Sequence, residues 1–379
     1  MPESSGAAAP SRHAVLHLGT ETGWRGGEAQ ALFLARGQKS RGRRAVVVSP
    51  PGSELLKRAA AEGIETVAFA ARGEWDLAAG RRLAGLVAAT SAALVHAHTA
   101  HAAALLLLAR PFLCRARGVV ARRVSFPIRP PVLGRVKYSW GVDRVIAVSE
   151  AIRRSLVRQG LEPARVAVVH SGIDAPRFAA GRRQPVRAAL LQAGGFPDDA
   201  LLVGTVGHLA AHKGIDRFLE AAALFGRAAP RARFVVVGRG AEEQALRALA
   251  ARLGLDGRVL FAGFRDDLPD LYAALDLFAL ASISGEGSPA VLKEAMAAGV
   301  PVVSSSLDGV EEIIEDARHG LLTPPGDAAA MARALDRLAA DPPLRERLSD
   351  AGRRRAAEFS IERMVEKTEA VYASLGVPA

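Results

Sequence analysis

Two glutamates eight residues apart, Glu286 and Glu294, form the strongest chemical signal in this sequence of 379 residues. A glycine- and serine-rich segment, 282–288, surrounds the first glutamate. Pro289 then predicts the first position of a helix, and Gly299 predicts its end. Apolar runs on either side predict buried strands of a parallel sheet. Free N–H groups at a helix start bind phosphate, and carboxylates accept hydrogen bonds from sugar hydroxyls, so the stretch predicts a nucleotide-sugar site.

The phosphate-binding part of this site is expected where the helix begins, at Ser288, Pro289, Ala290 and Val291. A second loop contributes Lys213, which stands directly before a glycine and a helix and follows the apolar strand 201–207. Loops that follow parallel strands gather at one edge of the sheet. The ammonium group is therefore expected to lie over the diphosphate.

With its trailing EAMAAGVPVV, the pair of glutamates resembles the E-x7-E signature of retaining GT-B glycosyltransferases of the family-4 type. The resemblance implies that Glu286 holds hydroxyls of the transferred sugar and that Glu294 holds the ribose. It also places Arg265 beside the base. The family often has an aromatic residue where Ser288 stands and an arginine where His208 stands, so the pocket shape and the phosphate-binding charge are expected to differ here.

The first half of the chain begins with a strand at 14–18, a glycine-rich loop and a helix through Lys39, the opening unit of a doubly wound domain. Gly26 and Gly27 in that loop permit close backbone approach to a bound group. They resemble the GG-E loop of the same glycosyltransferases, which implies contact with the donor. A plain turn is the alternative for a glycine pair.

Three histidines, His96, His98 and His101, follow one another at the end of the strand predicted at 94–98. A metal site is one interpretation, but no cysteine or acidic residue stands nearby at ligand spacing. His96 and His98 share a face by strand alternation, and His98 lies at the carboxyl end. In the resembling enzymes the second histidine of such an H-x-H reaches the transferred sugar and the acceptor, which implies that role for His98; a purely structural histidine is the alternative.

Charge is distributed unevenly along the chain. Residues 1–180 contain 26 Lys or Arg and 12 Asp or Glu, a net of +14, whereas residues 181–379 carry −3. The stretch 115–137, expected as a strand at 118–121 and otherwise a loop, is rich in arginine with apolar residues between. It predicts contact with an anionic membrane or acceptor through Arg122, Arg123 and Arg129. Arginine-rich composition from a GC-rich genome is the alternative, and no nucleic-acid motif accompanies the run.

The resemblance implies an α/β fold of the GT-B type, with two Rossmann-like doubly wound domains facing across a cleft. Acceptor binding is expected in residues 1–178 and donor binding in residues 186–358. A C-terminal helix at 359–379 is expected to cross back to the first domain, and 176–185 is expected to be a linker. One cysteine, Cys114, and the lack of an apolar signal at the start favour a cytoplasmic protein. We expect a monomer that docks on the inner face of the membrane through its basic stretch.

The expected reaction is transfer of a hexosyl group from a nucleotide-diphosphate sugar to a hydroxyl of a cell-envelope or lipid-linked glycan. The resemblance implies retention by same-face attack, with the leaving phosphate taking the proton. Without a D-x-D motif, neither a metal nor another cofactor is expected, and without a full G-x-G-x-x-G a dehydrogenase is not favoured. The alternatives are a GT-B sugar-nucleotide epimerase, a phosphorylase-like enzyme and a non-catalytic, membrane-associated protein that binds sugar nucleotides.

Overall fold

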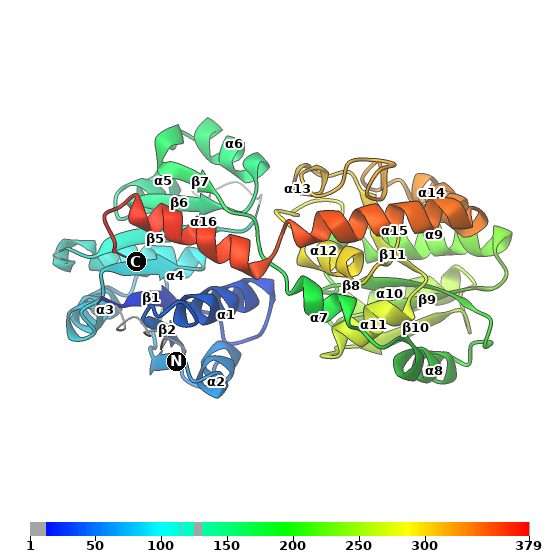
Figure 1. Cartoon of the computed structure of the whole chain (residues 1–379), viewed down its shortest axis with the longest axis horizontal. Helices are drawn as coiled ribbons and strands as arrows, with labels where there is room; N and C mark the ends of the chain where they lie inside the picture. The colour runs from blue at the N-terminus through cyan, green and yellow to red at the C-terminus, as the bar shows by residue number, and fades with distance from the viewer. Residues whose placement is uncertain (1–12, 114, 125–130, 379) are drawn as a thin grey trace, which may run out of the picture. The chain divides into compact units, whose positions relative to one another are not determined.

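A computed structural model describes residues 13–113, 115–124 and 131–378. It divides the chain into two compact units (Figure 1). Unit 1 comprises Met1–Gly172 together with Ile361–Ala379, and unit 2 comprises Ile173–Ser360. The last helix, α16 (Ile361–Ala373), thus belongs to the same unit as the N-terminal strands.

Unit 1 is built on seven parallel strands in the order β3-β2-β1-β4-β5-β6-β7. They are β1 (Val15–Leu18), β2 (Ala45–Ser49), β3 (Glu65–Ala68), β4 (Leu94–Ala97), β5 (Arg117–Arg122), β6 (Arg144–Ala147) and β7 (Val166–Val168). In addition to α16, the helices of unit 1 are α1 (Gly26–Lys39), α2 (Glu54–Ala61), α3 (Leu77–Ala89), α4 (Ala100–Ala109), α5 (Pro131–Ser139) and α6 (Glu150–Arg158). Because side chains alternate along a strand, Leu16 packs with α3 and α4, whereas Val15 packs with α1 and α16.

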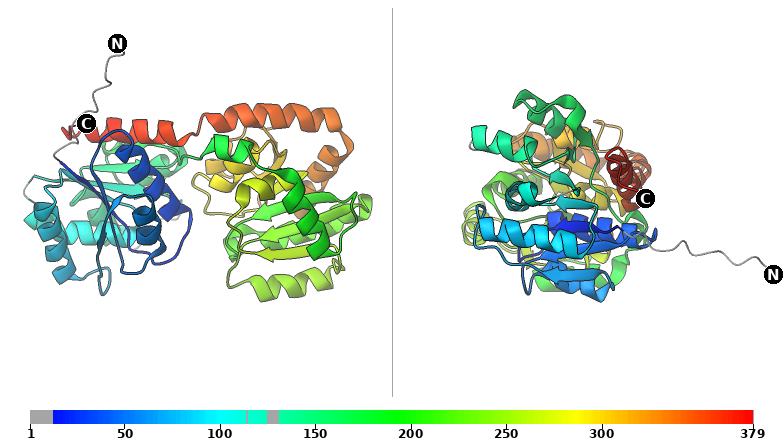
Figure 2. Two further views of the ribbon diagram at one scale, coloured as in Figure 1. Left: turned by 60° about the horizontal axis from the view of Figure 1, so that its bottom comes forward. Right: turned by 90° about the vertical axis from the view of Figure 1, so that its left-hand side faces the viewer.

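Unit 2 is built on six parallel strands in the order β10-β9-β8-β11-β12-β13. They are β8 (Leu201–Val206), β9 (Ala232–Val237), β10 (Val259–Gly263), β11 (Leu277–Leu280), β12 (Val302–Ser305) and β13 (Leu321–Thr323). Its helices are α7 (Ala175–Ala179), α8 (Arg183–Gly194), α9 (Ile215–Ala228), α10 (Glu243–Arg252), α11 (Leu268–Ala274), α12 (Ala290–Ala297), α13 (Asp308–Glu311), α14 (Ala328–Ala340) and α15 (Pro342–Ala357). Figure 2 shows helices on both faces of this sheet. The expected pair of doubly wound α/β domains is confirmed.

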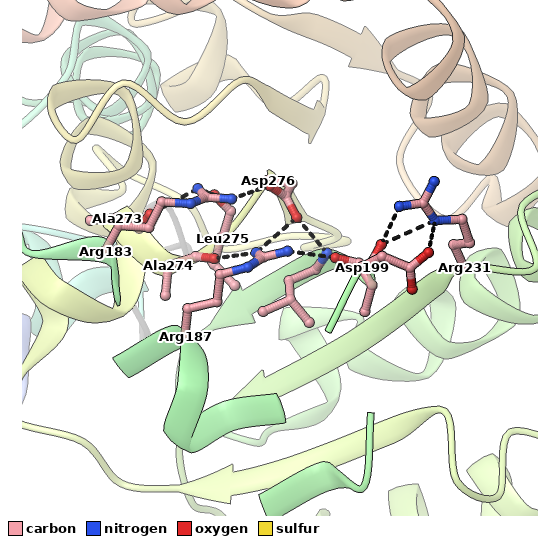
Figure 3. Close-up of polar contacts among 10 residues, drawn as sticks. Arg183, Arg187, Asp199, Arg231, Ala273, Ala274, Leu275 and Asp276 are labelled. Carbon is pink, nitrogen blue, oxygen red and sulfur yellow. Dashed lines mark hydrogen bonds and ion pairs between the residues drawn. The ribbon is translucent and has the colours of Figure 1, made fainter. Parts of the chain in front are cut away.

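The expectation of a linker at 176–185 is wrong, because α7 and the start of α8 occupy most of it. Two arginines of α8 fix this segment to unit 2. Arg183 donates to Asp276 at 2.5 Å and Arg187 donates to the same carboxylate at 3.0 Å. Figure 3 shows both guanidinium groups pointing at Asp276, with further bonds to the carbonyls of residues 273–275. The Pro and Gly content of this segment predicted a linker. The hydrogen bonds from Arg183 and Arg187 to the distant Asp276 instead stabilise the helix α8.

The expectation of a loop after residue 121 is also wrong in part. Strand β5 continues through Arg122, and α5 covers 131–139. Residues 125–130, which include Arg129, lie outside the described residues, as does Cys114. Within the parts of the chain that the structure describes, we find no helix with both the length and the apolar character needed to cross a bilayer.

Candidate functional site

Two loops of unit 2 meet at the carboxyl ends of β8 and β11, which are neighbouring strands of the sheet. The N–H group of Ile283 donates to the carbonyl of His212 at 2.9 Å. Gly214 has a left-handed φ of 61°, and a Cβ atom there would lie 2.0 Å from the carbonyl oxygen of Ala281. Only glycine therefore fits between the loops, and this close approach brings Lys213 to the loop that carries Glu286.

Lys213 and Glu286 form an ion pair with 2.7 Å between Nζ and Oε1. The same carboxylate oxygen accepts a hydrogen bond from the hydroxyl of Ser282 at 2.6 Å. Glu286 is buried and Lys213 is only partly so. The structure thus brings together two residues that the sequence singled out separately, and it adds Ser282, which the sequence reasoning missed.

Helix α12 begins one residue later than expected. Pro289 is its N-cap residue, with extended ψ of 114°, and Ala290 and Val291 are the first helical positions. Proline at the N-cap donates no hydrogen bond, and the first N–H groups of a helix lack partners within it. The helix start therefore remains suited to an anion, although Pro289 is wrongly predicted as the first helical residue.

A lysine that the sequence reasoning missed lies beneath this loop. Lys293 is fully buried and donates from Nζ to the hydroxyl of Ser288 at 2.9 Å. Its ammonium also lies 5.0 Å from the ring centroid of Phe359. Burial lowers the pKa of Lys293 to about 7. Ser288, which replaces the family's aromatic residue, is thus the acceptor for a cation from the following helix.

Glu294 accepts a hydrogen bond from the hydroxyl of Tyr272 in α11 at 3.2 Å. Burial raises the pKa of Glu294 to about 7, against the lowering effects of Tyr272 and Lys293. A carboxyl group whose pKa is raised in this way donates a hydrogen bond when it is protonated, in addition to accepting one. A ribose diol, which also donates and accepts, would suit such a group.

The remaining donor-site candidates lie on adjacent loops. His208 follows β8 and is exposed, and Arg265 follows β10. Arg265 donates to both oxygens of Asp267, at 2.8 and 2.5 Å, so its guanidinium is engaged within its own loop. Arg239, which the sequence reasoning did not single out, is exposed after β9, between these two strand ends in the sheet.

In unit 1, Gly26 and Gly27 are the first two residues of α1. A Cβ atom on Gly26 would meet nothing within 4 Å, and one on Gly27 would lie 3.9 Å from Cδ of Arg123. The buried carboxylate of Glu28 accepts from the N–H of Arg25 at 3.0 Å. The space beside this helix start is therefore open, as a bound group would require.

Unit 1 contains a cluster of three buried histidines. Its members are His17, His96 and His98, and not the expected His96, His98 and His101. His17 pairs with His96 in register across β1 and β4, so both point to the face covered by α16. His101 instead lies in α4, and the prediction that it clusters with His96 and His98 is wrong. The signal that could have found His17 is the single histidine inside an apolar strand, the same pattern as in β4.

A directed chain of hydrogen bonds passes through two of these histidines. An arginine only donates, so Nδ1 of His98 accepts from Arg123 at 3.0 Å and its Nε2–H donates to Nδ1 of His17 at 3.0 Å. His17 then donates from Nε2 to Gln38 at 2.6 Å. Gln38 donates to Glu369 of α16 at 2.6 Å. Arg123 can only donate and the carboxylate of Glu369 can only accept, so every hydrogen bond between them runs from Arg123 toward Glu369. This direction fixes one tautomer for each of the two imidazole rings.

Two of the three arginines expected at an anionic surface, Arg122 and Arg123, lie in the described residues, and neither is fully exposed. Arg122 is 9% exposed and donates to the hydroxyl of Tyr138 at 3.3 Å. Arg123 is partly buried against His98. The prediction of a membrane-facing surface is therefore wrong for Arg122, which is the last residue of the central strand β5; Arg123 directly follows the strand and is turned toward His98.

The ligand atoms of His17, His96 and His98 lie within 4.8 Å of one another, which is close enough for a metal ion. A metal-binding histidine usually donates its second N–H group to an acceptor. His98 instead accepts from Arg123 at that nitrogen, and burial together with His96 and Arg123 holds its pKa well below the ordinary value. The adjacent guanidinium of Arg123 makes the cluster unsuited to a divalent cation.

Taken with the two parallel sheets, the ion pair and helix start of unit 2 define a GT-B architecture with a candidate donor site in its second unit. The family described as Glycosyl transferases group 1 matches residues 186–355, and the one described as Glycosyltransferase Family 4 matches residues 24–177. The two matches cover most of both units. The chain belongs to the family-4-type GT-B glycosyltransferases, which confirms the resemblance seen in the sequence.

The chain is 34% identical over 255 residues to the D-inositol 3-phosphate glycosyltransferase of Streptomyces bingchenggensis (strain BCW-1), over 64% of this chain and 55% of that protein. It is 38% identical over 156 residues to the lipopolysaccharide core biosynthesis glycosyltransferase LpsE of Rhizobium meliloti (strain 1021), over 41% of this chain and 44% of that protein. The chain thus spans about half the length of these relatives. The crystal structure of Anabaena HepE in complex with UDP and glucose has the same fold, with a TM-score of 0.83 and 23% identity over 96% of this chain and 100% of that one.

Proposed function

We propose that this chain is a retaining hexosyltransferase that moves a sugar from a nucleotide-diphosphate sugar to an acceptor hydroxyl. The observation that carries the proposal is the ion pair of Lys213 and Glu286 beside the start of α12. This arrangement supplies a cation, a carboxylate and free N–H groups within the loops at one edge of a parallel sheet. A charged diphosphate joined to a sugar needs these groups in combination.

Each group has a separate task in the proposed reaction. Lys213 and the N–H groups at Ala290 and Val291 stabilise the diphosphate as it leaves with the electron pair of the bond to the sugar. Glu286 holds hydroxyls of the sugar, and Glu294 holds the ribose. The acceptor oxygen bonds to the anomeric carbon on the face from which the diphosphate departs, and a phosphate oxygen takes the hydroxyl proton.

The donor contacts of His208 and Arg265 remain part of this proposal. His208 lies on the loop that also carries Lys213, and the main chain near Arg265 is placed beside the base. On the unit 1 side, Gly26 and Gly27 leave open space next to a helix start. No metal is included, because the diphosphate charge is met by Lys213 and by helix N–H groups; activity should therefore survive EDTA.

A donor screen tests the proposal directly. UDP-, GDP- and ADP-sugars are compared by thermal shift, because a ligand that binds the folded state raises its unfolding temperature. Turnover is then measured with the stabilising donor and a panel of acceptors, and the anomeric configuration of the product is read by NMR. Transfer with retention supports the proposal. Binding without transfer to any acceptor, or release of an altered donor without an acceptor, would contradict it.

We propose further that the acceptor is a lipid-linked or cell-envelope glycan reached at an anionic membrane. The relative LpsE carries a name from lipopolysaccharide core synthesis. Unit 1 also exposes several large apolar side chains near exposed arginines. They are Trp75, Leu77, Phe112, Val136 and Trp140, hereafter the exposed apolar residues of unit 1.

Two contacts relate these residues to one another. An ion pair between Glu74 and Lys137 joins the segment before α3 to α5, so Trp75 and Val136 lie on neighbouring elements. The guanidinium of Arg81 in α3 lies 5.2 Å from the ring centroid of Phe112. Aromatic side chains beside exposed arginines suit the interface of an anionic bilayer. Membrane contact is thus assigned to these exposed side chains and no longer to Arg122 and Arg123.

A further inference from the structure

Arg123 carries a partly buried positive charge that forms no direct ion pair with a carboxylate of the described residues. Its Nε atom is inaccessible and has no hydrogen-bond partner among the described residues. Its guanidinium donates to the uncharged imidazole of His98. It forms no ion pair with any of the residues that the structure describes. Burial lowers its pKa to about 10, so the group stays charged at neutral pH. A partly desolvated cation without a directly paired anion is costly, and a ligand anion would reduce that cost.

The surroundings of Arg123 suit an anion. Its Cδ atom lies 3.9 Å from the position of a Cβ on Gly27, at the N-terminal end of a helix of 14 residues. Glu28 in the first turn is the nearby carboxylate, and it accepts a hydrogen bond from the N–H of Arg25 and none from Arg123 among the described residues. The partial positive charge of the helix end therefore adds to that of the guanidinium.

The histidine chain fixes the position of this guanidinium. His98 is itself held by His17, which is held by Gln38 and, through it, by Glu369 of α16. Both ring nitrogens of His98 are used within this chain, so its imidazole has no N–H group left to offer a substrate. The arginine, by contrast, keeps further N–H groups.

We propose that Arg123 binds a phosphate group of the substrate and that His98 is a positioning residue for it. The proposal rests on the proposed function and exchanges the roles that the sequence suggested for these two residues. The phosphate can come from the diphosphate of the donor or from a phosphorylated acceptor. Both have the chemistry that a guanidinium recognises through paired hydrogen bonds.

The test compares Arg123→Met with Arg117→Met by calorimetry, using UDP and inorganic phosphate as probes. Arg117 is the matched control, because it begins the strand that Arg123 follows but is exposed and pairs with Asp143. Arg123→Met should weaken at least one probe about tenfold or more, whereas the control should bind as the wild type does. Thermal unfolding checks that both variants are folded, and Arg123→Lys, which keeps the charge, should recover part of the affinity.

The pattern of losses distinguishes the two sources. A loss for UDP assigns the site to the donor diphosphate, and a loss for phosphate alone assigns it to a phosphorylated acceptor. Unchanged affinity for both probes would overturn the proposal and leave the proposed function standing. A wild type that binds no sugar nucleotide would instead count against the proposed function.

Nitrogen-15 NMR of the histidines supplies a second readout that loss of stability would not produce. The wild type should show His98 with its hydrogen on Nε2 and an Nδ1 resonance that shifts when phosphate binds. In Arg123→Met the tautomer should persist, because Gln38 and Glu369 still fix it from the other end, but the Nδ1 resonance should no longer shift with phosphate. A wild-type His98 with its hydrogen on Nδ1 would show that Arg123 is not held by this residue.

Discussion

The ammonium of Lys213 lies 2.7 Å from the carboxylate oxygen of Glu286 that also accepts from Ser282. Without a ligand, the cation proposed for the diphosphate is therefore neutralised by the acid proposed for the sugar. A bound diphosphate must share Lys213 with Glu286 or replace it. The two residues are consequently coupled, and their variants should not have additive effects.

The first prediction concerns this pair. Lys213→Met should weaken a nucleoside diphosphate by about ten- to hundredfold, because a hydrogen bond to a charged group contributes about 1.5–3 kcal/mol. Glu286→Gln should retain or increase that affinity, since it releases Lys213, but should lose most turnover. Calorimetry with the diphosphate and with the matching nucleoside separates phosphate contacts from base contacts. Equal losses for both ligands in Lys213→Met would exclude Lys213 as the phosphate ligand.

The second prediction concerns Lys293 and Ser288. Lys293→Met preserves the volume but removes the ammonium that donates to Ser288 at 2.9 Å. We expect donor affinity to fall by about tenfold, because the loop before α12 loses one of its restraints, while stability changes little when a buried charge is replaced by an apolar group. Ser288→Ala and the double variant complete a thermodynamic cycle for donor binding. Additive losses would mean that the two residues do not act through their hydrogen bond.

The third prediction tests the backbone that brings the two loops together. Gly214→Ala places a Cβ atom 2.0 Å from the carbonyl of Ala281 at a left-handed φ of 61°. The loops must separate to accept it, so we expect a loss of stability of more than about 1 kcal/mol together with weaker donor binding. Gly42→Ala is the control, because it also has a positive φ of 79° but no atom within 4 Å of the added Cβ. It should lose stability through strain and keep its donor affinity.

The sequence was sufficient for the parallel sheets and for the loop and helix around Glu286. Strands buried on both faces are continuous apolar runs, and the loops that follow them must lie at the carboxyl edge, so Lys213 and Glu286 could be assigned to one site. Local chemistry failed where a distant partner decides the structure. The Pro- and Gly-containing segment at 176–185 is helical because Arg183 and Arg187 bind Asp276 about 90 residues later.

The roles of Arg122 and Arg123 were misjudged for a related reason. Their neighbours in sequence are basic and apolar, which is typical of a membrane-facing surface, but their contacts are Tyr138 and His98. No local sequence pattern shows that arginines at the end of a strand contact buried side chains instead of solvent. Lys293 was missed similarly, since a lysine within a helix is ordinarily exposed.

The fourth prediction is a loss of stability in acid caused by the histidine cluster. Burial lowers the pKa of His17 from 6.5 to about 4, and those of His96 and His98 are also held well below the ordinary value. A pKa that is lower in the folded state stabilises fully above pH 6.5, and this contribution is lost as the pH falls through about 4. For His17 alone it amounts to about 3 kcal/mol.

Urea unfolding at pH values between 7 and 4 measures this effect. His17→Gln should make the dependence less steep, because the variant has one buried imidazole fewer to protonate, whereas His208→Gln, at an exposed position, should unfold with the wild-type slope. Other groups titrate in this range, so the difference in slope between the two variants is the decisive quantity. Parallel curves for His17→Gln and the wild type would show that His17 does not resist protonation in the folded chain.

The last prediction concerns the exposed apolar residues of unit 1. Trp140 is 75% exposed and Trp75 is 51% exposed, on elements that the Glu74–Lys137 ion pair joins. The wild type should sediment with anionic vesicles and only weakly with neutral ones. High salt should release it, because the attraction of basic groups is screened over about 8 Å at physiological ionic strength. Replacing both tryptophans with serine should weaken this binding and leave donor affinity unchanged.

Phe264→Ser is the control, since Phe264 is 51% exposed but belongs to unit 2. Undiminished vesicle binding by the double variant would move the docking surface elsewhere, and indifference of the wild type to anionic vesicles at low salt would favour an acceptor free in solution.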